Sequence, residues 1–261
     1  MTITPPRGID LFRLDGQWAV ITGGSRGLGY EMASALASAG ANVVLLGRDA
    51  AAASSAADRL RGDYNIEVRT AAADVVDLPA VTAAIDRVAS ECGQLDVLIN
   101  SAGVNIRGPI ETFDPADFDR VIRTNVHGTW NACRAAVPHM KARGYGRIIN
   151  MASALGLVGL AGRTPYASSK GAVVQLTRTL GVELAESGVT CNAICPGPFL
   201  TEMNLPVSRD EAATRQILGC TAMGRWGQMH EIHAAAIYLA SPGSSFTTGS
   251  MLSVDGGWTA L

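Results

Sequence analysis

The sequence is poor in charge. Only 17% of its 261 residues are Asp, Glu, Lys or Arg, and the formal net charge is −2. Such a chain offers no basic surface for nucleic acid or for an anionic membrane, so neither is expected as a partner. It also has no apolar run of the roughly 20 residues that a membrane-spanning helix needs, and residues 1–14 lack the apolar segment of a signal peptide. We therefore expect a cytoplasmic protein.

Metal-ligating patterns are scarce as well. The five cysteines form no Cys-x-x-Cys pair, and the close histidine pair, His230 and His233, has no third ligand near it in sequence. Protein zinc sites use three or four such ligands. We therefore expect no metal, and we expect reduced thiols. Cys191 and Cys195 are predicted to pack in the core from a strand.

Glycine and apolar residues are abundant instead, with 29 glycines and 48% hydrophobic residues. Short apolar runs alternate with longer helical patterns. The predicted strands are residues 18–22, 42–46, 68–72, 97–100, 147–151, 190–195 and 251–254, and the predicted helices are residues 30–39, 50–60, 81–91, 117–143, 166–185 and 231–239. This alternation predicts an α/β protein: a single doubly wound Rossmann-type domain over residues 1–261, with a parallel seven-stranded sheet and helices on both faces. Residues 198–226 interrupt the pattern and are predicted to form a substrate lid.

A glycine-rich loop joins the first predicted strand to the first predicted helix. It reads Thr22-Gly23-Gly24-Ser25-Arg26-Gly27-Leu28-Gly29. A helix N-terminus offers free N–H groups and the positive end of the helix dipole, which together suit a pyrophosphate. In such a loop Gly23 permits a tight turn, Gly27 lets the backbone approach a phosphate, and Gly29 lets the helix pack against the strand. The loop therefore predicts dinucleotide binding.

The spacing TGxxxGxG resembles that of the short-chain dehydrogenase/reductase family. Further matches follow in the family's order over about residues 12–258: Asp74, Asn100-Ser101-Ala102-Gly103 where the family has NNAG, Asn125, Ser153, Tyr166-x3-Lys170, Pro196-Gly197 with Thr201, and Asp255-Gly256-Gly257. The resemblance implies an oxidoreductase that uses a nicotinamide cofactor. The cofactor-binding residues that it implies are Gly23, Ser25, Arg26, Gly27, Leu28, Gly29, Arg48, Asp74, Val75, Asn100, Ala102, Gly103, Tyr166, Lys170, Pro196, Gly197 and Thr201.

Four residues are the candidate catalytic groups. Tyr166 and Lys170 are spaced i, i+4, so they share one face of a helix. A tyrosine with its ordinary pKa of about 10 is a poor base at neutral pH, and a nearby ammonium lowers that pKa. The resemblance implies that Tyr166 exchanges a proton with the substrate oxygen, that Ser153 hydrogen-bonds that oxygen, and that Lys170 also holds the nicotinamide ribose. It implies that Asn125 positions a water in a proton relay.

The end of the second predicted strand bears on cofactor preference. Relatives that prefer NAD(H) carry an acidic residue there, which binds the adenosine ribose. Here Gly47 occupies that position, Arg48 follows it, and Arg26 lies in the glycine loop. Guanidinium groups without a competing carboxylate suit a 2′-phosphate, so NADP(H) is predicted, with NAD(H) as the alternative. Asp49 is predicted to cap the following helix.

The substrate is a small molecule, and its class has two main candidates. Residues 195–204 and 255–260 resemble gluconate 5-dehydrogenase-like and polyol dehydrogenases, which indicates a secondary alcohol/ketone pair on a sugar-acid or polyol-like substrate. The alternative is a 3-oxoacyl-[acyl-carrier-protein] reductase. Its docking arginines correspond to Asn131 and Ser187, which are uncharged here and disfavour an acidic carrier protein.

Arg107, Arg163 and Arg209 are candidate cations for a sugar acid. A third hypothesis is a non-catalytic NADP(H) sensor, which is disfavoured because all four catalytic residue types are present. Members of the family commonly pair helices between subunits, and the predicted helix 166–185 is apolar on several sides. The apolar residues are Ala172, Val173, Val174, Leu176, Leu180, Val182 and Leu184. A homotetramer is therefore predicted.

Overall fold

The computed structural model describes residues 7–261, which form one seven-stranded sheet in the order β3-β2-β1-β4-β5-β6-β7. The strands are β1 (Trp18–Thr22), β2 (Asn42–Gly47), β3 (Val68–Ala72), β4 (Val97–Asn100), β5 (Gly146–Met151), β6 (Val189–Pro196) and β7 (Met251–Val254). Every neighbouring pair is parallel. The predicted doubly wound, seven-stranded parallel sheet is confirmed.

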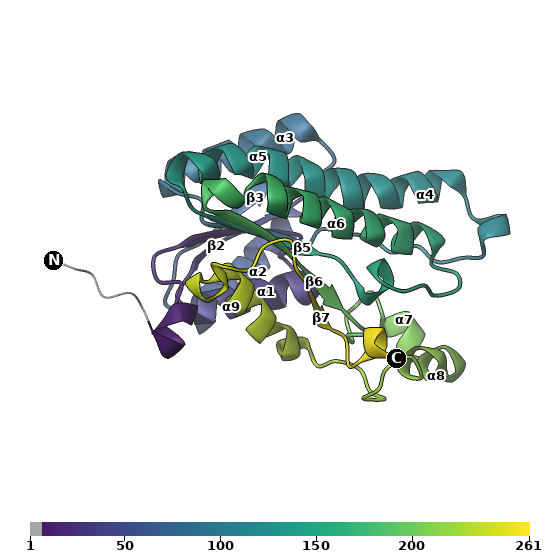
Figure 1. Ribbon diagram of the computed structural model, residues 1–261. Coiled ribbons are helices and arrows are strands. Elements are labelled where there is room, and N and C mark those ends of the chain that lie inside the picture. Colours follow the sequence, from purple (N-terminus) through teal and green to yellow (C-terminus); the bar gives the residue numbers. More distant parts are fainter. Residues whose placement is uncertain (1–6) are drawn as a thin grey trace.

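The longer helices are α1 (Gly27–Ser38), α2 (Ala50–Asp63), α3 (Leu78–Cys92), α4 (Pro115–Ile122), α5 (Gly128–Arg143), α6 (Thr164–Glu183) and α9 (His233–Ala240). Helices α1, α2 and α9 cover one face of the sheet, and α3, α5 and α6 cover the other (Figure 1). Successive residues of a strand point to opposite faces. Accordingly, Ala19 and Ile21 of β1 pack with the first group of helices, whereas Val20 packs with the second.

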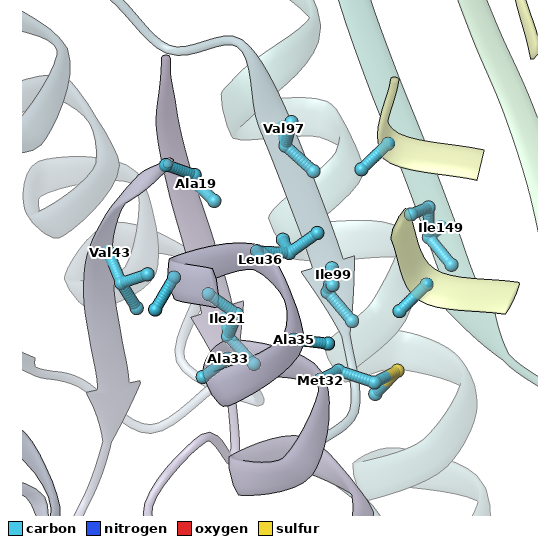
Figure 2. Close-up of a cluster of buried hydrophobic side chains, with 14 of the residues drawn as sticks. Ala19, Ile21, Met32, Ala33, Ala35, Leu36, Val43, Val97, Ile99 and Ile149 are labelled. Carbon is cyan, nitrogen blue, oxygen red and sulfur yellow. The ribbon is translucent and has the colours of Figure 1, made fainter. Parts of the chain in front are cut away.

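The core beneath α1 shows why the strands are apolar throughout. Met32 and Leu36 of α1 lie over Ile21 and Ile99, from the neighbouring strands β1 and β4 (Figure 2). All five residues of β1 and all eight of β6 are buried. A strand covered on both faces has no solvent side, so its sequence does not alternate between apolar and polar.

Several helix and strand ends differ from the prediction by one to three residues, and two of the differences concern elements of the site. Residues 117–143 do not form one helix: a π-helical turn, Arg123–His127, separates α4 from α5. The amide of Gly128 donates to the carbonyl of Arg123, five residues back, which is the wider π spacing. Helix α1 begins three residues before the predicted start, because the glycine loop itself supplies its first turn. Asp49 caps α2, as predicted, by accepting from the amide of Ala52 at 2.9 Å.

The segment after β6 is more ordered than its composition indicates. Residues 198–226 contain α7 (Leu205–Ser208) and α8 (Glu211–Leu218). Asp210 caps α8 by accepting from the amides of Ala212 and Ala213. No helix within residues 7–261 is long and apolar enough to cross a membrane. The same part of the chain holds no cluster of three or more His, Cys, Asp or Glu side chains that could bind a metal ion.

Candidate active site

The site lies where the strand order reverses. Strand β1 is flanked by β2 on one side and β4 on the other, and Thr22 is paired with Asn100 at the carboxyl ends of β1 and β4. Ligands of open parallel sheets bind at such a reversal. The hydroxyl of Thr22 accepts from the amides of Ser101 and Ala102 at 3.1 and 3.2 Å. The glycine loop and the turn after β4 are thereby fastened to each other.

Two glycines of the loop are required by close backbone contacts. Gly23 has a φ of +65°, and a Cβ there would lie 2.9 Å from the Cα of Ala102. A Cβ at Gly29 would overlap the carbonyl oxygen of Gly23. Leu28 packs partly buried against the core beneath the sheet. The backbone contacts of the loop therefore require glycine at both positions, and its binding of a phosphate stays a prediction.

The two loop arginines each lie near a carboxylate. Arg48 Nη1 is 3.5 Å from Asp74 Oδ2, and Arg26 Nη1 is 3.6 Å from Glu202 Oε2. The sequence predicts no competing carboxylate, but the structure places one beside each arginine. Both arginine side chains are nevertheless more than 70% exposed. Sequence reasoning identified the arginines but not Glu202, which lies in the predicted lid far along the chain.

Ser153 and Tyr166 come together from β5 and α6. Ser153 follows β5, and its hydroxyl accepts from the amide of Leu155 at 3.1 Å. Tyr166 lies in the first turn of α6. Burial raises the pKa of Tyr166 above its ordinary value, and a hydrogen bond with Ser153 and the positive charge of Arg107 oppose that rise. The structure therefore brings the predicted proton donor and its hydroxyl partner into contact.

Lys170 is buried on the same helix. Its Nζ donates to the carbonyl oxygen of Met151 at 2.5 Å and lies 5.7 Å from the centroid of the Tyr166 ring. Burial lowers the pKa of Lys170 to about 8. Burial also raises the pKa of Tyr166, and the positive charge of Arg107 opposes that rise. The expected lowering of this pKa by Lys170 stays a prediction.

Asn125 is fully buried in the π-helical turn. Its Oδ1 accepts from the amide of Val104 at 2.8 Å, and its Nδ2 donates to the carbonyl of Val104 at 3.0 Å and to Ser169 Oγ at 3.0 Å. A Cβ at Gly103 would lie 3.2 Å from Asn125 Oδ1 and 3.8 Å from Lys170 Nζ. The side chains of Asn125 and Lys170 therefore approach the same turn. Neither Val104 nor Ser169 was identified from sequence.

Four further predicted cofactor positions lie at or near the ends of β4 and β6. The amide of Gly197 donates to the carbonyl of Val254 at 3.0 Å, and Thr201 donates its amide to the carbonyl of Phe199 at 2.8 Å. Asn100 points into the sheet, where its Nδ2 donates to Asn150 Oδ1 at 2.9 Å. Pro196 ends β6 and is buried, so these residues shape the carboxyl edge of the sheet.

Two partly buried arginines, Arg107 and Arg163, lie close enough to influence each other, and Arg107 also contacts the predicted lid. Arg107 Nη2 donates to Asn204 Oδ1 at 2.8 Å and to the carbonyl of Met203 at 3.3 Å. Burial lowers the pKa of both Arg107 and Arg163, and the charge of Arg107 lowers that of Arg163 further. Within residues 7–261 neither forms an ion pair with a carboxylate. Arg209, the third candidate, is exposed.

The two positions compared with carrier-protein reductases are not equivalent surface sites. Asn131 is only 6% exposed, and its Nδ2 donates to the carbonyl of Val75 at 2.9 Å. Ser187 is partly buried and donates to the carbonyl of Leu184 at 2.6 Å. Asn131 therefore faces the interior of this protein, so its lack of charge says less about a docking partner than the sequence suggested.

Comparisons with known proteins agree with this geometry. A family model described as enoyl-(acyl carrier protein) reductase matches residues 23–259. The gluconate 5-dehydrogenase of Gluconobacter oxydans is 39% identical, and the alignment covers 96% of this chain and 97% of that protein. The galactitol 2-dehydrogenase (L-tagatose-forming) of Cereibacter sphaeroides is 42% identical, over 95% and 97% of the two chains. A crystal structure of a gluconate 5-dehydrogenase from Burkholderia cenocepacia, in complex with NADP and tartrate, is 40% identical with a TM-score of 0.94, and the match covers 97% of this chain and 99% of that one.

Proposed function

Because the chain belongs to the short-chain dehydrogenase/reductase family, we propose that it uses NADP(H) to interconvert a secondary alcohol and a ketone on a small substrate that carries a carboxylate. The pair of partly buried arginines, Arg107 and Arg163, carries this proposal. A desolvated guanidinium without a carboxylate partner is costly, and a substrate carboxylate would supply the missing counter-charge. Similar chains include a gluconate 5-dehydrogenase and a protein that binds tartrate, which is a hydroxylated dicarboxylate.

The residues divide the chemistry in a simple way. The bound nicotinamide supplies or accepts the hydride. Tyr166 gives its phenolic proton to the carbonyl oxygen in reduction and takes it back in oxidation. Ser153, whose hydroxyl opposes the rise in the pKa of Tyr166, stabilises the negative charge that develops on the same oxygen. Lys170 holds ribose hydroxyls and adds positive charge, while Asn125 fixes the turn at Val104 and the start of the proton relay.

Residues 198–226 are proposed to act as the substrate lid. Two arginines join this segment to the body of the protein: Arg107 through Asn204, and Arg26 through Glu202. Both are also the residues proposed to meet anionic groups of the ligands. Binding of substrate and cofactor should therefore order the lid and exclude water from the path of the hydride.

A substrate panel with an Arg107→Met variant tests the substrate class. For 5-ketogluconate the variant should raise KM at least about tenfold, because a charge-assisted hydrogen bond contributes roughly 1.5–3 kcal/mol. For a neutral keto sugar, KM should change less than about twofold. The variant also loses the positive charge that Arg107 places near Tyr166, and this loss would lower kcat for both substrates alike. The measurement that tests the carboxylate is therefore the ratio of KM for 5-ketogluconate to KM for the neutral keto sugar.

Arg209→Met, which removes an exposed arginine of residues 198–226, is the control and should leave that ratio unchanged. The panel also includes a short 3-oxoacyl thioester and simple aromatic ketones. If the thioester is turned over with the highest kcat/KM, the fatty-acid-synthesis alternative replaces our proposal. If the unaltered protein prefers a neutral polyol ketone, the proposal that the substrate carries a carboxylate is wrong.

Cofactor preference is a second expected outcome. The unaltered protein should prefer NADP(H) over NAD(H) at least tenfold in kcat/KM, about 1.4 kcal/mol. Arg48→Asp should reverse the preference, because it places a carboxylate where the 2′-phosphate would lie. Arg87→Asp makes the same charge change on the exposed side of α3 and should have no such effect. Equal efficiency with NAD(H) in the unaltered protein would show that the argument from Gly47 and Arg48 is wrong.

We also propose a homotetramer. Large apolar side chains remain exposed on the helices that we expect to pair: Trp130 of α5 is 47% exposed, Val182 of α6 is 80% exposed, and Phe118 of α4 is 39% exposed. Exposed apolar residues gathered on such helices favour association. Analytical ultracentrifugation should therefore show a tetramer, and a stable monomer at micromolar concentration would contradict the proposal.

A further inference from the structure

Helix α5 holds the turn after β3 by a buried hydrogen bond. Asn131 Nδ2 donates to the backbone carbonyl of Val75 at 2.9 Å, and both residues are 6% exposed. The bond joins elements that are 56 residues apart in the chain. Inside a protein, an unpaired carbonyl costs about 1–3 kcal/mol, so the bond fixes where this turn lies.

A second contact presses on the same residue. Gly128, the first residue of α5, lies so close that a Cβ there would be 2.5 Å from Val75 Cγ2. Helix α5 therefore fixes both the carbonyl and the side chain of Val75. Two separate contacts from α5 therefore restrain a single residue of the turn after β3.

The turn that α5 holds lies beside the proposed site of the 2′-phosphate. The amide of Ala73 donates to the carbonyl of Gly47, so the turn adjoins the end of β2. Asp74 accepts from the amide of Val76 at 3.1 Å, and its other carboxylate oxygen is 3.5 Å from Arg48. At the carboxyl edge of the sheet, the positions beyond β2 are those farthest from Tyr166. A dinucleotide that lies along this edge with its reactive end at Tyr166 must place its adenosine end here.

We infer that Asn131 is a positioning residue for the adenosine half of the cofactor. It acts through Val75 and Asp74, and through Asp74 it also sets the position of Arg48. This inference rests on the proposed use of NADP(H). Asn125, which holds the turn at Val104 beside Lys170, precedes Asn131 by six residues on the same interrupted helix. One continuous segment therefore fixes both ends of the cofactor site, each through an asparagine bonded to the backbone of a strand-end turn.

The chain offers a matched control. Asn192 on β6 is also buried, and its Nδ2 donates to the carbonyl of Thr247 at 2.7 Å. Thr247 precedes β7, which lies at the opposite edge of the sheet from β3. Asn131→Asp and Asn192→Asp therefore make the same chemical change, each replacing a buried amide donor that faces a backbone carbonyl, but only the first touches the proposed adenosine site.

The test is calorimetric titration with 2′,5′-ADP, which contains only the adenosine half, and with reduced nicotinamide mononucleotide, which lacks it. Asn131→Asp should weaken 2′,5′-ADP and NADPH at least fivefold, leave the mononucleotide within twofold, and leave kcat at saturating NADPH within twofold. Lowering the pH protonates the carboxylate that the substitution introduces and restores a donor. The loss of affinity for 2′,5′-ADP relative to the unaltered protein should therefore shrink from pH 8 to pH 6. Asn131→Ser serves as a milder second variant if the first does not fold.

Two results would overturn the inference alone: unchanged binding of 2′,5′-ADP in both Asn131 variants, or an equal loss in Asn192→Asp. If the unaltered protein binds neither NADPH nor 2′,5′-ADP, the proposed cofactor is wrong and the inference fails with it.

Discussion

Tyr166→Phe should reduce ketone turnover to below about 1% of the unaltered rate, since general acid catalysis by a positioned side chain contributes about 10²–10⁴-fold. The phenyl ring keeps its packing at the start of α6, but no proton can be given to the substrate oxygen. Binding of NADPH, measured by fluorescence titration, should stay within about twofold, because the change removes a single oxygen.

Tyr145→Phe is the control for this prediction. Tyr145 also carries a phenol whose pKa is raised by burial, but it lies just before β5, at the edge of the sheet opposite to the active site, and bonds Gln17 at 3.4 Å. Its loss should leave kcat unchanged. Retention of more than a few per cent of the rate in Tyr166→Phe would show that another group is the acid, and Tyr166 would lose its proposed role.

Lys170→Met should raise the melting temperature while it removes activity. Lowering the pKa of a buried lysine from 10.5 to about 8 costs roughly 3 kcal/mol of stability at pH 7, at about 1.4 kcal/mol per pKa unit. Removing the lysine removes this cost, but it also leaves the carbonyl of Met151 without its donor, which offsets about 1–3 kcal/mol of the stabilisation. The net gain of about 0–2 kcal/mol should raise Tm by up to roughly 8 °C, at about 2–4 °C per kcal/mol. The kcat/KM should fall at least about 100-fold.

The pH dependence of this gain has a definite sign. The folded protein holds the proton of Lys170 less tightly than the unfolded chain does, so the cost is complete below the folded pKa of about 8. It declines as the pH rises toward 10.5 and disappears above it. The difference in Tm between variant and unaltered protein should therefore shrink between pH 8 and pH 10. Lys141→Met, at the chain's other lysine, alters an exposed side chain and should change Tm by less than about 1 °C at any pH. A lower Tm for Lys170→Met at pH 7 would contradict the prediction.

The sheet could be predicted almost completely from the sequence, because each buried strand is an apolar run with polar or glycine residues at its ends. Strands β1, β3, β4 and β7 have the predicted bounds, and β6 extends the prediction by one residue at each end. The helix over residues 117–143 could not be predicted correctly. Its π-helical turn depends on bonds from Asn125 to Val104, 21 residues away in the chain, and no local periodicity records such a partner.

The candidate catalytic residues could be identified because their spacing resembles a known family, but their electrostatics could not. The distance between Tyr166 and Lys170 in the sequence says nothing about how much water reaches either group, and burial decides the pKa shift of both. The role of Asn131 was missed for a related reason. A polar residue in a helix is expected at the surface, and only the fold reveals that this one faces Val75.

The π-helical turn also limits how this part of the chain can change in length. An α-helix rotates by about 100° per residue, so one extra residue in a turn changes the direction of every side chain beyond it. Deleting Val126 or His127 would shorten the segment between Asn125 and Asn131, so the two side chains would no longer both face their present partners, Val104 and Val75. Substitutions at exposed positions of this turn should be tolerated, whereas a single insertion or deletion should not. The number of residues between the two asparagines is therefore under stronger constraint than the identity of those that separate them.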